Sequence, residues 1–162
     1  KKGFQEYLNF EVKSNKYVSK LKLGLKFKFP QNYPANQLYD GAFSFSKHYY
    51  EVIGQMNKEE AECAFLIDTN SNVEYWVRNL EQKESSSFWF QTSTDKFYPD
   101  FIVKLKNGTI VVIEYKGKDR YSDDDSKEKR LIGDYYSYIG NKKFKFIMLQ
   151  GKDWNTLNEY LK

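Results

Sequence analysis

Two apolar runs joined by an Asn-Gly pair constrain the fold of this chain more than any other stretch. The first covers residues 101–105 (FIVKL) and the second covers residues 110–116 (IVVIEYK), with Asn107-Gly108 between them. An Asn-Gly pair between β-branched runs is the strongest short-range signal for a β-hairpin. Both runs are apolar on both faces, so they predict two neighbouring strands in the middle of a covered sheet.

Three ionisable residues, Asp100, Glu114 and Lys116, lie inside these runs or beside them. Glu114 and Lys116 are two apart on one strand and therefore share a face. A two-residue loop would set Asp100 opposite Tyr115, whereas a three-residue loop that ends in Gly108 sets it opposite Glu114. Gly108 suits the left-handed third position of the longer loop, and a β-bulge would give the same pairing. We predict the register that brings Asp100, Glu114 and Lys116 together.

Two carboxylates and an ammonium group on one patch are what a hard divalent cation and a phosphodiester require. Mg²⁺ takes oxygen ligands, stabilises charge on a phosphate and lowers the pKa of a bound water. Lys116 then orients that water or offsets the developing charge. The neighbouring carboxylates favour the charged form of Lys116, so its pKa is not expected to fall far below about 10.4 and a role as simple general base is disfavoured.

Pro99-Asp100, thirteen intervening residues and then Glu114-Tyr115-Lys116 resemble the PD-(D/E)xK nuclease motif. The surroundings extend the resemblance, which covers roughly residues 43–149. They are similar to the C-terminal endonuclease domain of type III restriction enzyme Res subunits. The similar segments are 46–50 (SKHYY), 75–79 (YWVRN), 88–90 (FWF), 95–101 (DKFYPDF), 114–117 (EYKG) and 127–133 (KEKRLIG).

This resemblance implies an α/β fold with a restriction-endonuclease-like core, in which helices flank a mixed central sheet in the order α-β-β-β-α-β. It implies a Mg²⁺ ion, replaceable by Mn²⁺, held by Asp100, Glu114 and the main-chain carbonyl of Tyr115. The substrate would be double-stranded DNA, with a helicase ATPase upstream in the same polypeptide and a methyltransferase (Mod) subunit for target recognition. Residues 1–42 lie outside the resemblance and are expected to form a β-rich N-terminal extension of the domain, whereas residues 43–162 would form the nuclease core.

A helix is predicted to begin near Asn57, because Asn57 and Glu60 form a capping-box pattern. Glu60 also leads an apolar stripe (Cys63, Ala64, Ile67) that would face the sheet. Glu60 is therefore either a third carboxylate for the metal, directly or through water, or only a cap. Helical spacing does not exclude Glu62, whereas the family pattern favours Glu60, with Ala64 and Asp68 in place.

Several cations are candidates for DNA contact. Arg78, at the end of a predicted strand over residues 73–78, either meets phosphate or pairs with an acidic neighbour. Lys118 follows the motif. A second helix is predicted from Ser126 to Ile139, after three aspartates (123–125) that cap it. Lys127 is expected on its sheet-facing side, where it either reaches the DNA backbone or lies on the surface. The expected apolar stripe of that helix is Leu131, Ile132, Tyr135, Tyr136, Tyr138 and Ile139.

Other segments are less informative. Residues 21–29 alternate as a half-buried strand does, and the lysines there (Lys22, Lys26, Lys28) either follow phosphates or guard a solvated edge. His48 is expected to be a packed, hydrogen-bonded residue in an aromatic cluster rather than a catalyst. A strand over residues 143–149 and a helix over residues 154–161 complete the order.

The composition sets outer limits. The chain has 162 residues, a net charge of +4, 19% aromatic residues and one cysteine, Cys63. Such a chain is one domain that can bind nucleic acid without being required to, and it lacks an internal disulfide or a cysteine-based zinc site. We find no GxxxxGK[ST] loop, so no nucleotide cofactor is expected in this chain. Neither a signal peptide nor an apolar span is evident, so a cytoplasmic protein with no membrane partner is expected.

The sequence therefore predicts a Mg²⁺-dependent DNA endonuclease domain. Two other classes stay open. One is a non-catalytic DNA-binding or scaffolding domain that keeps the nuclease fold. The other is an interaction domain in which Asp100, Glu114 and Lys116 form a structural ion pair.

Overall fold

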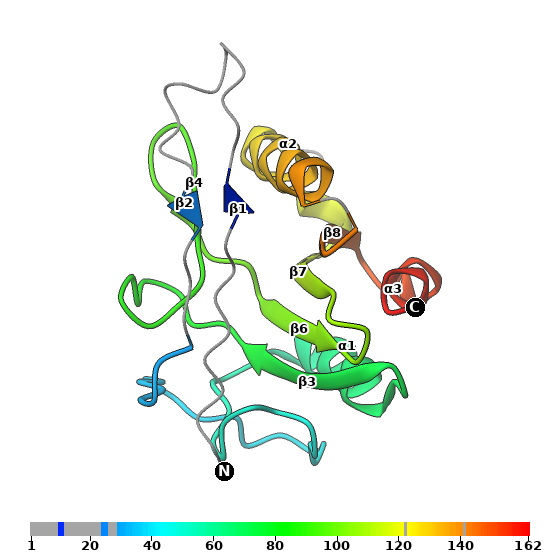
Figure 1. Cartoon of the computed structure of the whole chain (residues 1–162). Coiled ribbons are helices and arrows are strands. Elements are labelled where there is room, and N and C mark those ends of the chain that lie inside the picture. Colours follow the sequence, from blue (N-terminus) through cyan, green and yellow to red (C-terminus); the bar gives the residue numbers. More distant parts are fainter. Residues whose placement is uncertain (1–9, 12–23, 26–28, 122, 141) are drawn as a thin grey trace.

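The structure, a computed structural model, describes residues 10–11, 24–25, 29–121, 123–140 and 142–162 (Figure 1). Their elements follow in chain order. They are β1 (Phe10–Glu11), β2 (Gly24–Leu25), α1 (Lys58–Thr69), β3 (Val73–Arg78), β4 (Phe90–Gln91), β5 (Lys96–Phe97), β6 (Phe101–Leu105), β7 (Ile110–Lys116), the 3-10 helix η1 (Lys118–Arg120), α2 (Asp124–Ile139), β8 (Phe144–Gln150) and α3 (Trp154–Tyr160).

The described residues form one mixed four-stranded sheet in the order β3-β6-β7-β8. The β3–β6 and β6–β7 pairs are antiparallel, and β7 runs parallel to β8. The parallel pair needs a crossover, which α2 supplies. The expected α/β class is thus confirmed, with the expected order of one helix, three sheet strands, a helix and a strand.

The hairpin has the register that the sequence predicts. Phe101 pairs with Ile113 and Lys104 with Ile110. The Leu105 amide donates to the Thr109 carbonyl at 2.8 Å, so the loop holds three residues and ends in Gly108. Gly108 has a φ of +91°, a left-handed conformation that suits glycine. Continuing this register by one step sets Asp100 opposite Glu114.

Each face of the sheet packs against its own helices. The odd-numbered residues of β6 and β7 lie in one core cluster with α1 and α3, which includes Phe101 and Ile113. The even-numbered apolar residues of the two strands, Ile102, Ile110 and Val112, lie in a second cluster with α2 and the short β4–β5 pair. Both β6 and β7 are buried along almost their whole length, as expected for central strands. Figure 1 shows α1 and α3 on one side of the strands and α2 apart from them.

The predicted apolar stripe of α2 is partly wrong. Tyr136 is buried, but Leu131 and Tyr138 are 72% and 82% exposed. Ile132 and Ile139 pack against the same core cluster as Tyr136, as the stripe predicts. Gly133 also faces the sheet, since an added Cβ there would overlap the ring of Phe146 on β8. The sheet supplies the bulk at this contact, so the helix approaches closely through its glycine.

Both helix starts are capped as predicted. The Asn57 side chain accepts from the Glu60 amide and the Glu60 side chain accepts from the Asn57 amide, which completes the capping box of α1. The Asp123 side chain accepts from the Ser126 amide at the start of α2. The acidic run therefore acts as a helix cap, with Asp124 and Asp125 in the first turn, where acidic side chains complement the helix dipole.

Much of the N-terminal extension lies outside the described residues, including the lysine row at positions 22, 26 and 28. Its described parts include the antiparallel β1–β2 pair and residues 29–42. The latter contact the core: the Tyr39 amide donates to the Ile53 carbonyl and the Tyr33 hydroxyl to the Arg78 carbonyl. In the described part of the chain, no helix is both long and apolar enough to cross a membrane.

Candidate functional site

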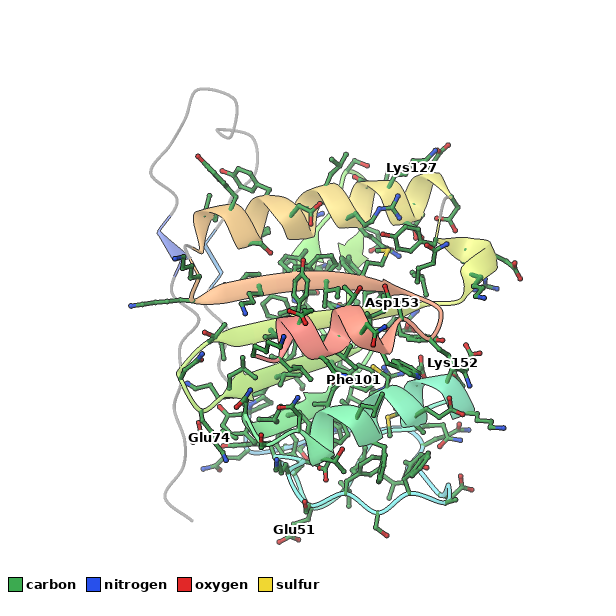
Figure 2. The ribbon with its side chains drawn as sticks, turned by 90° about the vertical axis from the view of Figure 1, so that its right-hand side faces the viewer. Glu51, Glu74, Phe101, Lys127, Lys152 and Asp153 are labelled. Atoms are coloured by element: carbon green, nitrogen blue, oxygen red, sulfur yellow. The ribbon has the colours of Figure 1, made fainter. Side chains whose placement is uncertain are left out.

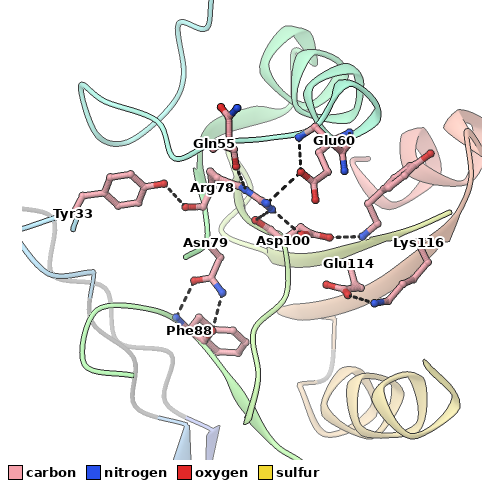
Figure 3. A network of polar contacts seen from close by, with 11 residues as sticks. Tyr33, Gln55, Glu60, Arg78, Asn79, Phe88, Asp100, Glu114 and Lys116 are labelled. Carbon is pink, nitrogen blue, oxygen red and sulfur yellow. Dashed lines mark hydrogen bonds and ion pairs between the residues drawn. The ribbon is translucent and has the colours of Figure 1, made fainter. Parts of the chain in front are cut away.

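Asp100 lies directly before β6, at the open end of the hairpin, and both of its carboxylate oxygens accept hydrogen bonds. Oδ2 accepts from the Tyr115 amide of β7 at 2.7 Å, and Oδ1 accepts from Arg78 Nη1 at the same distance. The hydrogen bond to Tyr115 is possible because the hairpin register brings the two residues together. Asp100 is thus a fixed, buried carboxylate at the edge of the sheet (Figure 3).

Glu114 is more deeply buried than Asp100. Its side chain is 7% exposed and Oε1 accepts from Lys116 Nζ at 2.9 Å, while Oε2 is buried without a hydrogen-bond partner among the described residues. Burial raises the pKa of Glu114 well above its usual value, the charge of Asp100 raises it further, and Lys116 offsets this only in part. A buried, unpartnered carboxylate oxygen is costly, so this position favours a bound cation.

Lys116 is positioned as a permanent cation. Burial lowers its pKa, but Glu114 and Asp100 outweigh that effect, and the pKa lies above the usual value for lysine. A lysine with a raised pKa keeps its proton at neutral pH. The expectation that Lys116 is no simple general base agrees with this direction.

Arg78 lies between two carboxylates from different elements. Its Nη1 donates to Asp100, and its Nη2 donates to Glu60 Oε2 at 3.2 Å (Figure 3). Of the two outcomes that the sequence left open for Arg78, the structure shows pairing with acidic neighbours. Burial lowers the pKa of Arg78 and these two carboxylates raise it by more, so the guanidinium stays charged.

Glu60 has the capping role that the sequence predicted, and it also pairs with Arg78. The same Oε2 atom accepts from the Asn57 amide at 2.8 Å and from Arg78, so Glu60 is both a helix cap and a member of the acidic cluster. Burial raises its pKa, and Arg78 opposes that rise. Glu62, the other candidate, forms an ion pair with Lys152 instead. Arg78 therefore links Glu60 of α1 to Asp100, because it forms an ion pair with each of them.

The main-chain carbonyl of Tyr115 is oriented towards Asp100. In an extended strand, the N–H and C=O groups of one residue point the same way, and those of the next residue point the opposite way. The Tyr115 amide donates to Asp100, whereas the Lys116 carbonyl accepts from Gly151 on the far side of the strand, at 2.7 Å. The carbonyl of Tyr115 consequently points to the side of Asp100, where the resemblance requires a ligand.

These groups fit a divalent cation in part. Asp100, Glu114 Oε2 and the Tyr115 carbonyl provide hard oxygen atoms, of which one lacks any partner. Over the described ranges, no group of three or more His, Cys, Asp or Glu side chains is arranged to hold a metal ion. Glu60 and Glu114 lie on different sides of the sheet: Glu60 belongs to α1, whereas Glu114 shares the α2 face with Val112. A ligand role for Glu60 stays a prediction.

Lys129 of α2 is a cation whose charge acts on Glu114, and sequence reasoning missed it. Its Nζ lies 5.1 Å from the centre of the Phe97 ring and pairs with Asp125 at 2.6 Å, and its charge lowers the pKa of Glu114. Lys127 instead pairs with Asp124 on the outer side of α2, with 57% of its side chain exposed (Figure 2). Of the two alternatives that the sequence left open for Lys127, this exposure agrees with a surface lysine, and its contact with DNA stays a prediction.

Lys118 is exposed in η1, directly after the site strand. Its side chain lies over Gly151, where an added Cβ would come within 3.0 Å of the lysine Cγ. Lys118 therefore lies at the same end of β7 and β8 as Lys116, and its predicted contact with DNA stays a prediction.

His48 is a packed residue, as predicted. The Arg78 amide donates to its Nε2 at 3.0 Å, so Nδ1 carries the hydrogen and donates to the Tyr50 carbonyl at 2.9 Å. The ring also lies edge-on to Trp76. Burial lowers the pKa of His48 to about 4. The neutral ring thus supports the main chain of Arg78 and takes no acid-base role at neutral pH.

Comparison with known proteins gives no match: no family model, no curated protein and no solved structure is similar to this chain. Function is therefore argued from the residues and geometry above.

Proposed function

We propose that this chain is a Mg²⁺-dependent DNA endonuclease domain with a PD-(D/E)xK core, of the kind found in type III restriction enzymes. The proposal rests above all on Glu114, whose Oε2 is buried and unpartnered beside Asp100. A sheet that brings two carboxylates, a strand carbonyl and a protonated lysine to one edge fits a hard cation and a phosphodiester.

The residues have separate tasks in this proposal. Asp100 is held in position by Arg78 and the Tyr115 amide, and with Glu114 and the Tyr115 carbonyl it would hold the ion. Bound Mg²⁺ would supply Lewis-acid stabilisation of the phosphate and a more acidic water. Lys116, which keeps its proton, would donate hydrogen bonds to the attacking water or to the charge that develops on the scissile phosphate.

The expected partners follow from the same proposal. The substrate would be double-stranded DNA, and the net charge of +4 permits its binding. Lys118 and Lys127 are the proposed backbone contacts, whereas the guanidinium of Arg78 is already paired with Glu60 and Asp100. A helicase ATPase in the same polypeptide and a Mod subunit would supply movement and target recognition, in a cytoplasmic enzyme.

A plasmid-cleavage assay with Mg²⁺ or Mn²⁺ tests the proposal directly. Lys116→Met removes the ammonium and keeps most of the side-chain volume. We expect it to lower the cleavage rate by about 100-fold or more, the usual loss when one stabilising donor is removed. Lys106→Met, at the exposed tip of the hairpin, is the matched control and should cleave at the wild-type rate. Equal rates for the two variants, or a wild-type protein that never nicks DNA with either metal, would refute the endonuclease proposal.

One observation favours a second candidate, a non-catalytic domain with a structural ion-pair network. Arg78 already neutralises Glu60 and Asp100, with its side chain 12% exposed. A buried guanidinium between two carboxylates can stabilise a fold without any metal. It leaves Glu114 Oε2 without a partner, however, and this is why we prefer the endonuclease.

A further inference from the structure

A pocket of about 370 Å³ opens beside Arg78, the residue that pairs with Glu60 and Asp100. Pro34, Asn36 and Gln37 of the N-terminal extension form one part of its lining. The segment from Arg78 to Lys83, apart from Gln82, forms another. Arg78 lines the pocket and also contacts Asp100, so a single side chain separates the two sites. This volume is within the range of small-molecule sites, which hold about 300–1,000 Å³.

The lining combines amide side chains with apolar surface. Asn36, Gln37 and Gln55 contribute carboxamides, and Pro34 and Leu80 contribute the apolar part. Amide groups carry both donors and acceptors, which is how proteins pair with the edge of a nucleobase. Apolar side chains pack against its flat face.

The charges argue against a phosphate in this pocket. Arg78 already makes four hydrogen bonds, to the Gln55 carbonyl, to the carbonyl and Oδ1 of Asp100, and to Glu60. Two further charges, Lys83 and Glu81, are of opposite sign. A lining without excess positive charge suits a neutral heterocycle better than an anion.

We propose that this pocket binds one unstacked nucleobase of the DNA strand, next to the phosphate that the acidic site cleaves. The proposal rests on the endonuclease function above and adds a base preference to it. Glu81 can accept a hydrogen bond from an exocyclic amino group but cannot donate one, so a base such as cytosine should be preferred to thymine. Residues 34–37 thereby gain a role in substrate selection.

Binding of short single strands tests the pocket without any cleavage. Fluorescence anisotropy would compare labelled dC8 with dT8 in EDTA, because both are pyrimidine strands that differ at the base edge. We expect the wild-type protein to bind dC8 about 10-fold more tightly, within the usual range for one well-placed base contact. Glu81→Gln and Asn36→Leu should reduce this ratio to near one.

The matched control is Glu74→Gln, which removes an exposed carboxylate elsewhere on β3 and should keep the preference for dC8. Equal binding of the two strands by the wild type, or an unchanged ratio in Glu81→Gln, overturns the pocket. Its failure is distinct from that of the endonuclease. A dC8 preference without metal-dependent nicking would support the pocket and refute the endonuclease. Nicking without the preference would support the endonuclease and refute the pocket.

Discussion

At the scale of single residues, His48 shows how burial fixes one protonation state. Its neutral ring accepts from the Arg78 amide and donates to the Tyr50 carbonyl, and a second proton would set an N–H group against the Arg78 N–H. The folded pKa of about 4 lies below the ordinary value of 6.5. Between these two values the unfolded chain binds a proton that the folded chain does not, so stability falls as the pH is lowered from about 6.5 to about 4.

We expect His48 to lower the free energy of unfolding by about 3 kcal/mol as the pH falls over this range, at about 1.36 kcal/mol for each unit of pKa difference. Urea unfolding at pH 7 and pH 4 would measure it, with His48→Asn as the comparison because asparagine does not titrate. The variant will be less stable at pH 7, yet it should lose about 3 kcal/mol less than the wild type on acidification. Parallel losses in the two proteins would show that His48 does not control this transition.

The positions of individual site residues differ in how far the sequence could predict them. Asp100, Glu114 and Lys116 are brought together by a three-residue loop, which is a local feature, and their pairing followed from the Asn107-Gly108 pattern. The partners of Arg78 lie 18 and 22 residues away, on a helix and on another strand. Such contacts depend on tertiary packing, so the sequence left a phosphate and an acidic partner equally open.

At the scale of elements, the hairpin turn fixes the register on which the site depends. A slip by one residue would set Asp100 opposite Tyr115 and move its carboxylate to the other face. Gly108 holds a left-handed φ of +91° with nothing near its missing Cβ. A substitution there therefore meets backbone strain alone, without a steric clash.

We predict that Gly108→Ala destabilises the fold by about 1–2 kcal/mol, the cost of a left-handed conformation for a residue with a Cβ. Gly117→Ala is the matched control, since Gly117 also has open space around its Cβ but a φ of −57°. Chemical denaturation would give both free energies of unfolding. Equal values for the two variants would contradict the argument that the turn conformation supports the register.

Helix α2 shows why element contacts are harder to predict than element positions. Its range was predicted to within two residues at its start, because the Asp123 cap and the apolar content are local signals. Its sheet-facing side was predicted only in part: Ile132, Tyr136 and Ile139 face the core, whereas the contact between Gly133 and Phe146 of β8 was missed. A pattern of large apolar residues on a helix cannot predict a contact in which the helix contributes a glycine and the strand contributes the large side chain.

At the scale of the whole molecule, the acidic edge formed by Asp100 and Glu114 lowers the stability of the fold, because two carboxylates are buried close together. Glu114 has a raised pKa because it is buried close to Asp100. Lys116 offsets its charge through an ion pair, and Lys129 does so from a greater distance. Anything that binds this edge in the folded state, and not in the unfolded chain, stabilises the whole fold by mass action. A divalent cation should therefore act on the unfolding of the entire chain.

We predict that Mg²⁺ or Mn²⁺ at about 100 times its Kd raises the free energy of unfolding by about 2.7 kcal/mol. For a chain of this size that corresponds to a rise in Tm of about 5–10 °C, since each kcal/mol shifts the midpoint by about 2–4 °C. Thermal unfolding with EDTA, with Mg²⁺ and with NaCl at the same ionic strength would measure the rise and separate it from screening.

Asp100→Asn and Glu114→Gln should each abolish the metal-dependent rise, while Lys106→Met at the hairpin tip should keep it. The variants also discriminate between the two candidate functions. If Arg78 and Lys116 alone balance the charges of Asp100 and Glu114, the wild-type Tm will be the same in Mg²⁺ as in NaCl of equal ionic strength. In that case Asp100→Asn would destabilise the protein equally with and without metal, because it removes a partner of Arg78, and the structural ion-pair network would be the better account of these charges.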